Sequence, residues 1–339
     1  MALKDIIGQQ KAIGMLVGAM QRNRVANAYL FAGESGIGKK TAAVNFAKAL
    51  NCLTNAAADG VLPSGDHAAH QAVIELSHDA CDACESCRKI DSGTHPDVLF
   101  ISPEDRQVRI DEIRKIDEAL SFRPFEGSQK IVIVDNAEAM NISAANAFLK
   151  TLEEPPPDSV IILVSSKPDY LPDTIRSRCS TITFVSLSLS SCKKIIAEKV
   201  AEENLELVAR LSMGNPGAAI VRDMLEEREW FLKLLKSMLK AEKDSWASRE
   251  EMERWCELIL ILLRDIAVVK ITGEPSRLIN IDQLDYILEL GNSHDVSVII
   301  YCYMEIDTIR RSLHYNRNKS LTWNYIASLL RKELGLWHA

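Results

Sequence analysis

The sequence predicts an α/β domain, in which a parallel sheet is flanked by helices, followed by a region made of helices alone. Short apolar, β-branched runs alternate with helix-like segments in the first half of the chain. After Val185 the strand pattern stops and helical periodicity continues. The 339 residues are 47% hydrophobic and 26% charged, which is enough apolar material for two or three domains with buried cores.

Five runs are predicted to be strands, because each is rich in apolar residues and is bounded by turn residues. They are Ala28–Ala32, Val98–Ile101, Ile131–Val134, Val160–Val164 and Thr181–Val185. Three helices are predicted between them, at Lys39–Leu50, Ile110–Ser121 and Ser143–Glu153. These helices supply the crossover connections that parallel strands need.

The helical region divides into a short unit and a longer one. The short unit, Cys192–Leu225, resembles a small lid, and long amphipathic helices follow it. We predict those helices at Glu250–Ile271, Val296–Tyr315 and Leu321–Leu334. The predicted domains are therefore residues 1–187 (α/β domain), 188–228 (helical lid) and 229–339 (all-helical domain).

The net charge and the distribution of apolar residues limit which partners and which cellular location we expect. With 47 acidic and 40 basic residues the formal net charge is -7, which does not favour high-affinity DNA binding by this chain alone. Met1–Gln10 has no apolar signal core, and the most apolar later run, Leu258–Ile271, is interrupted by Arg264 and Asp265. We expect a cytoplasmic protein without membrane spans.

A phosphate-binding loop (P-loop) is predicted directly after the first strand. The run Gly33-Glu34-Ser35-Gly36-Ile37-Gly38-Lys39-Lys40-Thr41 fits G-x-x-x-x-G-K. Gly33, Gly36 and Gly38 would let backbone N–H groups curl around phosphate oxygens, and Lys39 would reach the terminal phosphates. The alternative is a strand-to-helix turn that needs its glycines for geometry alone.

The same loop departs from the motif at one position. Lys40 stands where a Ser or Thr hydroxyl normally ligates Mg²⁺. Thr41 cannot simply replace that hydroxyl, because one residue along a helix rotates the side chain by about 100°. The sequence therefore leaves ATP and Mg²⁺ binding open.

A second departure lies at the end of the third predicted strand. Asp135 follows Ile131–Val134, where a carboxylate could hold Mg²⁺ through water or could cap the next helix. The next residue is Asn136, whose amide cannot act as a base toward an attacking water, and the first Glu is Glu138. Two defects in one site predict lost hydrolysis.

A cysteine cluster predicts a structural zinc site. Cys81, Cys84 and Cys87 provide three thiolates at C-x-x-C-x-x-C spacing, and Cys52 is the favoured fourth ligand of a tetrahedral site. His67, His70 and His78 compete for that fourth position. A redox role is weaker because no thioredoxin-like strand precedes the cysteines. The site would lie in an insertion at about residues 52–90.

Together these stretches resemble the bacterial clamp-loader AAA+ subunits over most of the chain. The carrying stretches are Ile7-Gly8-Gln9-Gln10, the phosphate loop, Val134-Asp135-Asn136-Ala137-Glu138, the run from Asn146 to Pro156, and Ile175-Arg176-Ser177-Arg178-Cys179. The resemblance implies an AAA+ domain with a zinc-binding insertion, a helical lid and an all-helical collar domain.

The resemblance also implies roles for two arginine positions. In that family Ser-Arg-Cys supplies an arginine finger to the nucleotide of the neighbouring subunit, and the matching residue is Arg178, with Arg176 for comparison. The alternative for Arg178 is a structural ion pair. Gly217 stands where active subunits carry a lid arginine, which Arg210 or Arg222 could replace.

The resemblance thus implies a DNA polymerase III clamp-loader subunit that lacks its own ATP hydrolysis and serves a neighbour. Implied partners are gamma/tau-type ATPases and a delta-type subunit, with the sliding clamp and primed DNA reached through the complex. One alternative is a self-sufficient AAA+ ATPase, in which Thr41 and Glu138 rescue the site. A DNA-binding module built on the zinc loop is disfavoured by the acidic residues around the cysteines.

Overall fold

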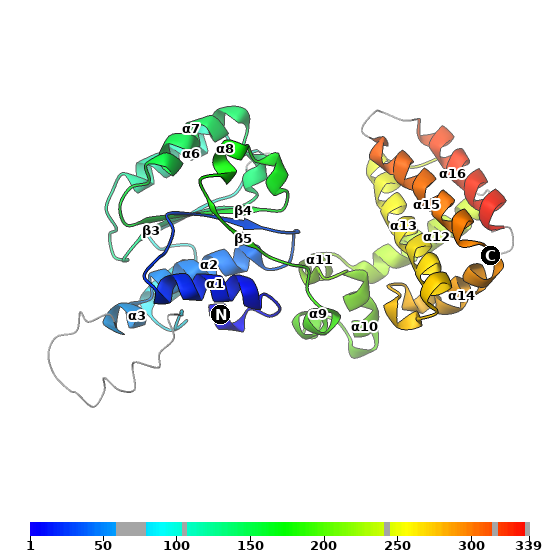
Figure 1. The fold of residues 1–339 in the computed structure, drawn as a ribbon, viewed down its shortest axis with the longest axis horizontal. Coiled ribbons are helices and arrows are strands. Elements are labelled where there is room, and N and C mark those ends of the chain that lie inside the picture. Colours follow the sequence, from blue (N-terminus) through cyan, green and yellow to red (C-terminus); the bar gives the residue numbers. More distant parts are fainter. Residues whose placement is uncertain (59–78, 104–106, 241–244, 314–317, 336–339) are drawn as a thin grey trace. The chain divides into compact units, whose positions relative to one another are not determined.

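The computed structural model describes residues 1–58, 79–103, 107–240, 245–313 and 318–335 (Figure 1). These residues form two compact units. The first comprises Met1–Ser191 with Gly214–Ala218, and the second comprises Cys192–Met213 with Ala219–Ala339. The predicted division into three domains stays a prediction, because this two-unit split does not test whether the lid folds by itself.

The first unit is built on a five-stranded parallel sheet, which confirms the predicted fold class. Its strands are β1 (Ala28–Ala32), β2 (Val98–Ile101), β3 (Lys130–Val134), β4 (Ser159–Ser165) and β5 (Ser180–Thr183). Their order is β2-β3-β4-β1-β5, so β1 and β4 are central and fully buried. The non-sequential order requires helical crossovers, which places helices on both faces of the sheet.

The last strand is shorter than predicted. We expected it to reach Val185, but β5 ends at Thr183. The side chain of Gln9 accounts for the difference, because its amide donates to the Val185 carbonyl at 2.8 Å and its oxygen accepts from the Val185 N–H at 3.2 Å. A side chain therefore takes the place of a neighbouring strand at this point.

Helices cover the two faces of the sheet (Figure 1). On one face lie α1 (Gln10–Gln21) and α2 (Lys39–Leu50), and on the other lie α6 (Ile110–Leu120), α7 (Ile142–Glu153) and the short α8 (Asp173–Arg176). The side chain of Asn141 caps α7 by accepting from the Ala144 N–H at 2.8 Å. Smaller elements are η1 (Leu3–Asp5), α3 (Leu53–Ala58), α5 (Glu85–Asp91), η2 (Ala137–Ala139) and η3 (Pro168–Tyr170).

The regular elements in the described residues of the second unit are all helices. Its helices are α10 (Glu202–Leu211), α12 (Met224–Leu239), α13 (Arg249–Thr272), α14 (Leu284–Ser293), α15 (Val296–Arg311) and α16 (Lys319–Leu334), with η4 (Pro275–Arg277) and η5 (Ile281–Gln283). Two helices are divided between the units: α9 (Leu189–Ile196) and α11 (Pro216–Val221) each begin in the first unit and end in the second. The α13, α15 and α16 helices match the three long predicted helices, although α15 ends at Arg311 and the predicted end, Tyr315, lies outside the described residues.

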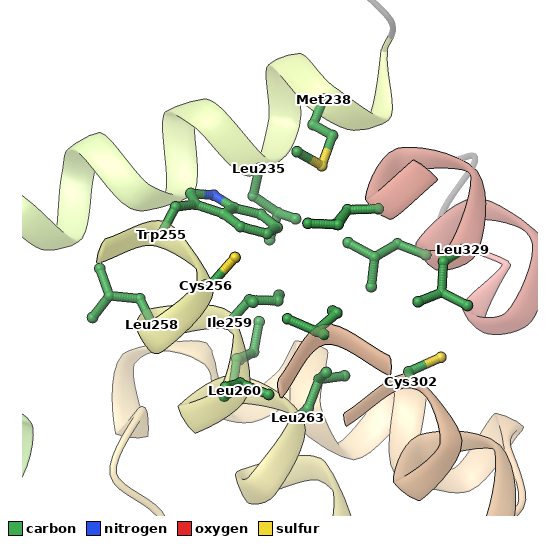
Figure 2. Packing of buried hydrophobic residues seen from close by; sticks show 14 of the residues in the cluster. Leu235, Met238, Trp255, Cys256, Leu258, Ile259, Leu260, Leu263, Cys302 and Leu329 are labelled. Atoms are coloured by element: carbon green, nitrogen blue, oxygen red, sulfur yellow. The ribbon is translucent and has the colours of Figure 1, made fainter. Parts of the chain in front are cut away.

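Large apolar side chains hold the second unit together (Figure 2). Trp246 packs with ring centroids 5.3 Å from Trp255 of α13 and 4.6 Å from Trp323 of α16. Phe231 of α12 lies 5.8 Å from Trp255, so three helices meet at one aromatic cluster. None of the helices in the described ranges combines the length and the apolar character needed to cross a bilayer.

Asp97, just before β2, is a buried carboxylate that organises the first unit. It is 1% exposed and accepts backbone N–H groups from the turn 125–127 at 2.7 to 2.8 Å. The Lys130 ammonium lies 3.0 Å from it. Burial alone would raise the pKa of Asp97, but these donors outweigh it and lower that pKa to about 2.

We therefore expect Asp97→Asn to destabilise the first unit by about 2 kcal/mol at neutral pH. Because the folded-state pKa is depressed, the stabilisation is present above the unfolded pKa of about 3.9 and is lost as the pH falls toward 2. Denaturant unfolding followed by circular dichroism at several pH values measures this difference. Asp111→Asn, at an exposed carboxylate on α6, is the control and should change little. If Asp97→Asn lowers the free energy of unfolding by the same amount near pH 2 as at neutral pH, the charged form of Asp97 is not the source of the stabilisation.

Candidate functional site

The phosphate loop connects β1 to α2 and depends on its glycines. Gly36 and Gly38 have φ angles of 75° and 97°, in the left-handed region that favours glycine. A Cβ atom at Gly33 would lie 2.5 Å from the carbonyl oxygen of Phe184, so a side chain does not fit there. The loop thus has the backbone of an anion-binding turn at a helix N-terminus.

Lys39 is the first residue of α2 and turns back onto the loop. It is 5% exposed, and its ammonium donates to the carbonyl oxygens of Gly33, at 2.6 Å, and Glu34. Burial lowers the pKa of Lys39, and the carboxylates of Glu138, Asp135 and Glu34 oppose that shift. Loop carbonyls therefore hold the charge that would face a terminal phosphate.

Lys40 faces the carboxylate at the tip of β3. Its ammonium lies 3.3 Å from Oδ2 of Asp135 and 4.4 Å from the ring centroid of Phe100 on β2. The Asp135 side chain is 17% exposed. Thr41, the next hydroxyl along the chain, is exposed. The residues present do not fit Mg²⁺, because a cation already pairs with the carboxylate and the ligating hydroxyl is absent.

The residues that follow Asp135 include an amide at the next position and a glutamate that is hydrogen-bonded through one of its two oxygens. Asn136 takes a left-handed conformation, with φ 48° and ψ 51°, and is exposed. One oxygen of Glu138 accepts from both the N–H and the hydroxyl of Ser166, at the end of β4. Burial raises the pKa of Glu138, but hydrogen bonds led by that from Ser166 outweigh it and lower the pKa. Glu138 is therefore held by Ser166, away from the position directly after Asp135.

The start of α11, with Asn215 just before it, lies on the phosphate loop. The Gly217 N–H donates to the Gly36 carbonyl at 3.0 Å. A Cβ atom on Gly217 would lie 2.6 Å from Gly36 Cα, and one on Gly36 would lie 2.0 Å from Oδ1 of Asn215. An arginine in place of Gly217 would therefore clash in this arrangement. Arg210 is engaged elsewhere, with Glu206 and with the carbonyls of Ser276 and Leu278.

Arg178 lies on the surface just after α8. Its guanidinium pairs with Glu153, at the end of α7, and donates to the Thr174 carbonyl at 2.9 Å. The side chain is 34% exposed. Arg176 is 35% exposed and pairs with Asp169 and Asp173 instead. Both arginines make ion pairs within the chain, and both keep part of the guanidinium at the surface.

The four predicted cysteines come together. The sulfur atoms of Cys52, Cys81, Cys84 and Cys87 all lie within 4.8 Å of one another. Backbone N–H groups donate to two of them, from Cys84 to Cys81 at 3.3 Å and from Cys87 to Cys84 at 3.4 Å. A tetrahedral site with metal–sulfur bonds of about 2.3 Å needs sulfur atoms about 3.8 Å apart, so this group can hold a metal ion.

The surroundings of the cysteine cluster shift the pKa values of two of its thiols in opposite directions. Burial raises the pKa of Cys81, but a hydrogen bond with the Thr54 side chain and others with backbone N–H groups outweigh it and lower that pKa to about 6. Burial and the neighbouring thiols raise the pKa of Cys87. His67, His70 and His78, the alternative fourth ligands, lie outside the described residues.

A buried lysine fixes the cysteine loop to the sheet domain. Lys48 of α2 is 0% exposed, and its ammonium pairs with Asp82 and, at 2.9 Å, with Asp91 at the end of α5. Asp79 accepts from the Leu3 and Lys4 N–H groups at 2.8 and 3.0 Å. The segment 79–91, which carries three of the cysteines, is therefore bonded both to the N-terminal residues and to α2. A buried ion pair of this kind need not add stability.

Comparison with known proteins identifies the family. A family model described as "DNA polymerase III, delta subunit" matches residues 8–188. DNA polymerase III subunit delta' of Bacillus subtilis is 25% identical over 96% of both chains, and that of Pseudomonas aeruginosa is 33% identical over 78% of this chain and 75% of its own length. The chain belongs to the DNA polymerase III delta' family of clamp-loader subunits. The expected family resemblance is confirmed. DNA polymerase III subunit tau of Bacillus subtilis, outside the delta' family, is 32% identical over 70% of this chain and 39% of its own length.

Within this delta'-family fold, the loop, Asp135 and the cysteines were predictable from the sequence, but several of their partners were not. The structure adds Phe100 and Ser166 to the loop site and Lys48 to the cysteine loop. A lysine in place of the loop hydroxyl was a usable signal for the pairing with Asp135. No local pattern distinguishes Phe100 on β2, or Ser166 just after β4, from neighbouring residues.

Proposed function

We propose that this chain is a stator subunit of the DNA polymerase III clamp loader, one that helps load the sliding clamp on primed DNA without hydrolysing ATP itself. In this role it supplies Arg178 to the nucleotide of a neighbouring subunit. The observation that carries the proposal is the Lys40 ammonium, 3.3 Å from Asp135, in a loop that otherwise has the form of a nucleotide site.

Three features of the loop support lost hydrolysis. The hydroxyl that would ligate Mg²⁺ is replaced by Lys40, and the position after Asp135 holds Asn136. The first glutamate after Asp135 in the sequence, Glu138, is hydrogen-bonded to Ser166. In phosphoryl transfer the metal neutralises developing charge and a carboxylate orients the nucleophile, so their absence leaves little catalysis.

The position of Arg178 supports a role toward a neighbour. It lies on the surface of the first unit and is one third exposed, and Glu153 and the Thr174 carbonyl orient its guanidinium. A planar, fixed guanidinium can stabilise charge on a transferring phosphoryl group, which a flexible ammonium does less well. Partners of the gamma/tau type would carry that phosphoryl group.

The cysteine cluster supports a structural zinc ion in the insertion. Cys52, Cys81, Cys84 and Cys87 would hold it, and four thiolates leave no open position for a reacting water. Bound zinc would contribute folding energy to this loop and no chemistry to ATP turnover.

Steady-state ATP turnover by the purified chain tests the proposal. We expect no turnover above that of a Lys39→Ala variant, because the site lacks both a metal ligand and a base. When mixed with gamma/tau-type and delta-type subunits, the same preparation should form a stable complex that hydrolyses ATP. Brisk hydrolysis by the chain alone, abolished by Lys39→Ala, would show it to be a self-sufficient ATPase instead.

A further inference from the structure

One side chain occupies the position at which a phosphate loop normally collects its metal ligands. In such loops a hydroxyl at the residue after the lysine ligates Mg²⁺, and a carboxylate at the tip of a neighbouring strand holds the ion through water. Here that residue is Lys40, and its ammonium lies 3.3 Å from Oδ2 of Asp135. A monovalent cation with no lone pair therefore faces the carboxylate that Mg²⁺ would need.

Two partners from different strands hold this ammonium. Asp135 extends from the end of β3, and the Phe100 ring of β2 lies with its centroid 4.4 Å from the Lys40 nitrogen. An ammonium over an aromatic face is attracted by the ring quadrupole, and a carboxylate adds a direct ion pair. The Lys40 side chain is 55% exposed, so its stem is not trapped by burial, and these two contacts define its position.

The rest of the loop keeps the backbone of a phosphate site. Gly36 and Gly38 retain the left-handed conformations, and Lys39 follows them at the start of α2. The mismatch with Mg²⁺ is therefore concentrated in one side chain, while Asp135 itself is present and largely buried.

We propose that Lys40 is the specificity-determining residue of this loop, a built-in counter-ion for Asp135 that excludes divalent metal from the pocket. Any nucleoside polyphosphate that enters is then taken without its metal. The inference rests on the proposed function, a site that does not hydrolyse ATP, and adds the reason that the site stays without Mg²⁺.

The variant Lys40→Ser tests this inference, because it removes the ammonium and restores a hydroxyl at the same position. Binding of ATP to the full chain would be measured by equilibrium dialysis, with excess Mg²⁺ or with EDTA. For the unsubstituted chain we expect Mg²⁺ to give no gain in affinity over EDTA. For Lys40→Ser we expect Mg²⁺ to tighten binding by about tenfold or more, since hydroxyl and carboxylate now face the ion together.

Two further variants make the result specific. Adding Asp135→Asn to Lys40→Ser should abolish the gain, because the second metal-holding group is lost. Lys115→Ser, at an exposed lysine on α6, changes the net charge equally and should produce no gain.

Each outcome decides the inference separately from the proposed function. A Lys40→Ser chain that binds ATP equally with Mg²⁺ and EDTA, or does not bind it at all, overturns the role of Lys40. Tighter binding with Mg²⁺ by the unsubstituted chain overturns it too. Neither result touches the stator proposal, which is tested separately by ATP hydrolysis of the unsubstituted chain and by its assembly with the other subunits.

Discussion

Arg178→Ala should lower ATP hydrolysis at the neighbouring subunit's site by roughly a thousand-fold, the scale of an arginine supplied in trans to a phosphoryl-transfer site. Arg178 lies on the surface and makes its ion pair with Glu153, so its loss should leave the fold intact. Turnover of the whole loader would fall less, because its other sites remain. Single-turnover hydrolysis by the reconstituted complex, with clamp and primed DNA present, resolves the affected site.

Arg176→Ala is the matched control for this experiment. Arg176 is two residues away, is exposed to the same degree and also makes ion pairs, so the two variants lose equal charge and similar contacts. We expect the Arg176 variant to retain most turnover. Arg178→Lys keeps the charge but loses the planar fork, and should be nearly as impaired as the alanine variant. If a complex with Arg178→Ala assembles and hydrolyses ATP at the normal rate, Arg178 has no role toward the neighbouring nucleotide and makes only its structural ion pair.

Cys87→Ala should lower the zinc content of the purified chain from about one ion per chain to almost none. Cys87 is fully buried within the cluster, and three remaining thiolates cannot complete a tetrahedral site. Because metal binding is part of the folding free energy of such a loop, the first unit should also unfold at lower temperature. Metal analysis and thermal unfolding measure the two effects.

Cys179→Ser provides the matched control for the zinc experiment. Cys179 belongs to the same unit but lies outside the cluster, packed against the sheet core, and burial raises its pKa to about 11. Its loss should leave the zinc content unchanged. An unsubstituted chain that is folded and metal-free would contradict the zinc assignment directly.

The sequence was a good guide to elements whose limits are set locally. The α2 helix begins and ends where predicted, at Lys39 and Leu50, because the left-handed Gly38 precedes it and a turn follows it. The five strands were found because buried parallel strands are continuous apolar runs. Cys52 was placed with the other cysteines because the chemistry of four thiolates depends little on the path of the chain between them.

Partners across the sheet could not be predicted in the same way. Phe100 reaches Lys40 only because β2 lies beside β3, and Ser166 reaches Glu138 only because β4 is the next strand. Strand order is a property of the whole fold, and the local sequence around each residue does not indicate which strand will lie beside it. The place of Gly217 against Gly36 is equally a consequence of how distant segments pack.

The aromatic cluster of the second unit determines which part of the protein is visible in intrinsic fluorescence. The sequence has 5 tryptophans, all of them after residue 229, and Trp246, Trp255 and Trp323 form one contact group. Tryptophan emission therefore reports the unfolding of the second unit and changes little when the first unit unfolds. Phe46 is buried beside Tyr29 in the first unit. A tryptophan introduced in its place would give the first unit its own fluorescence signal.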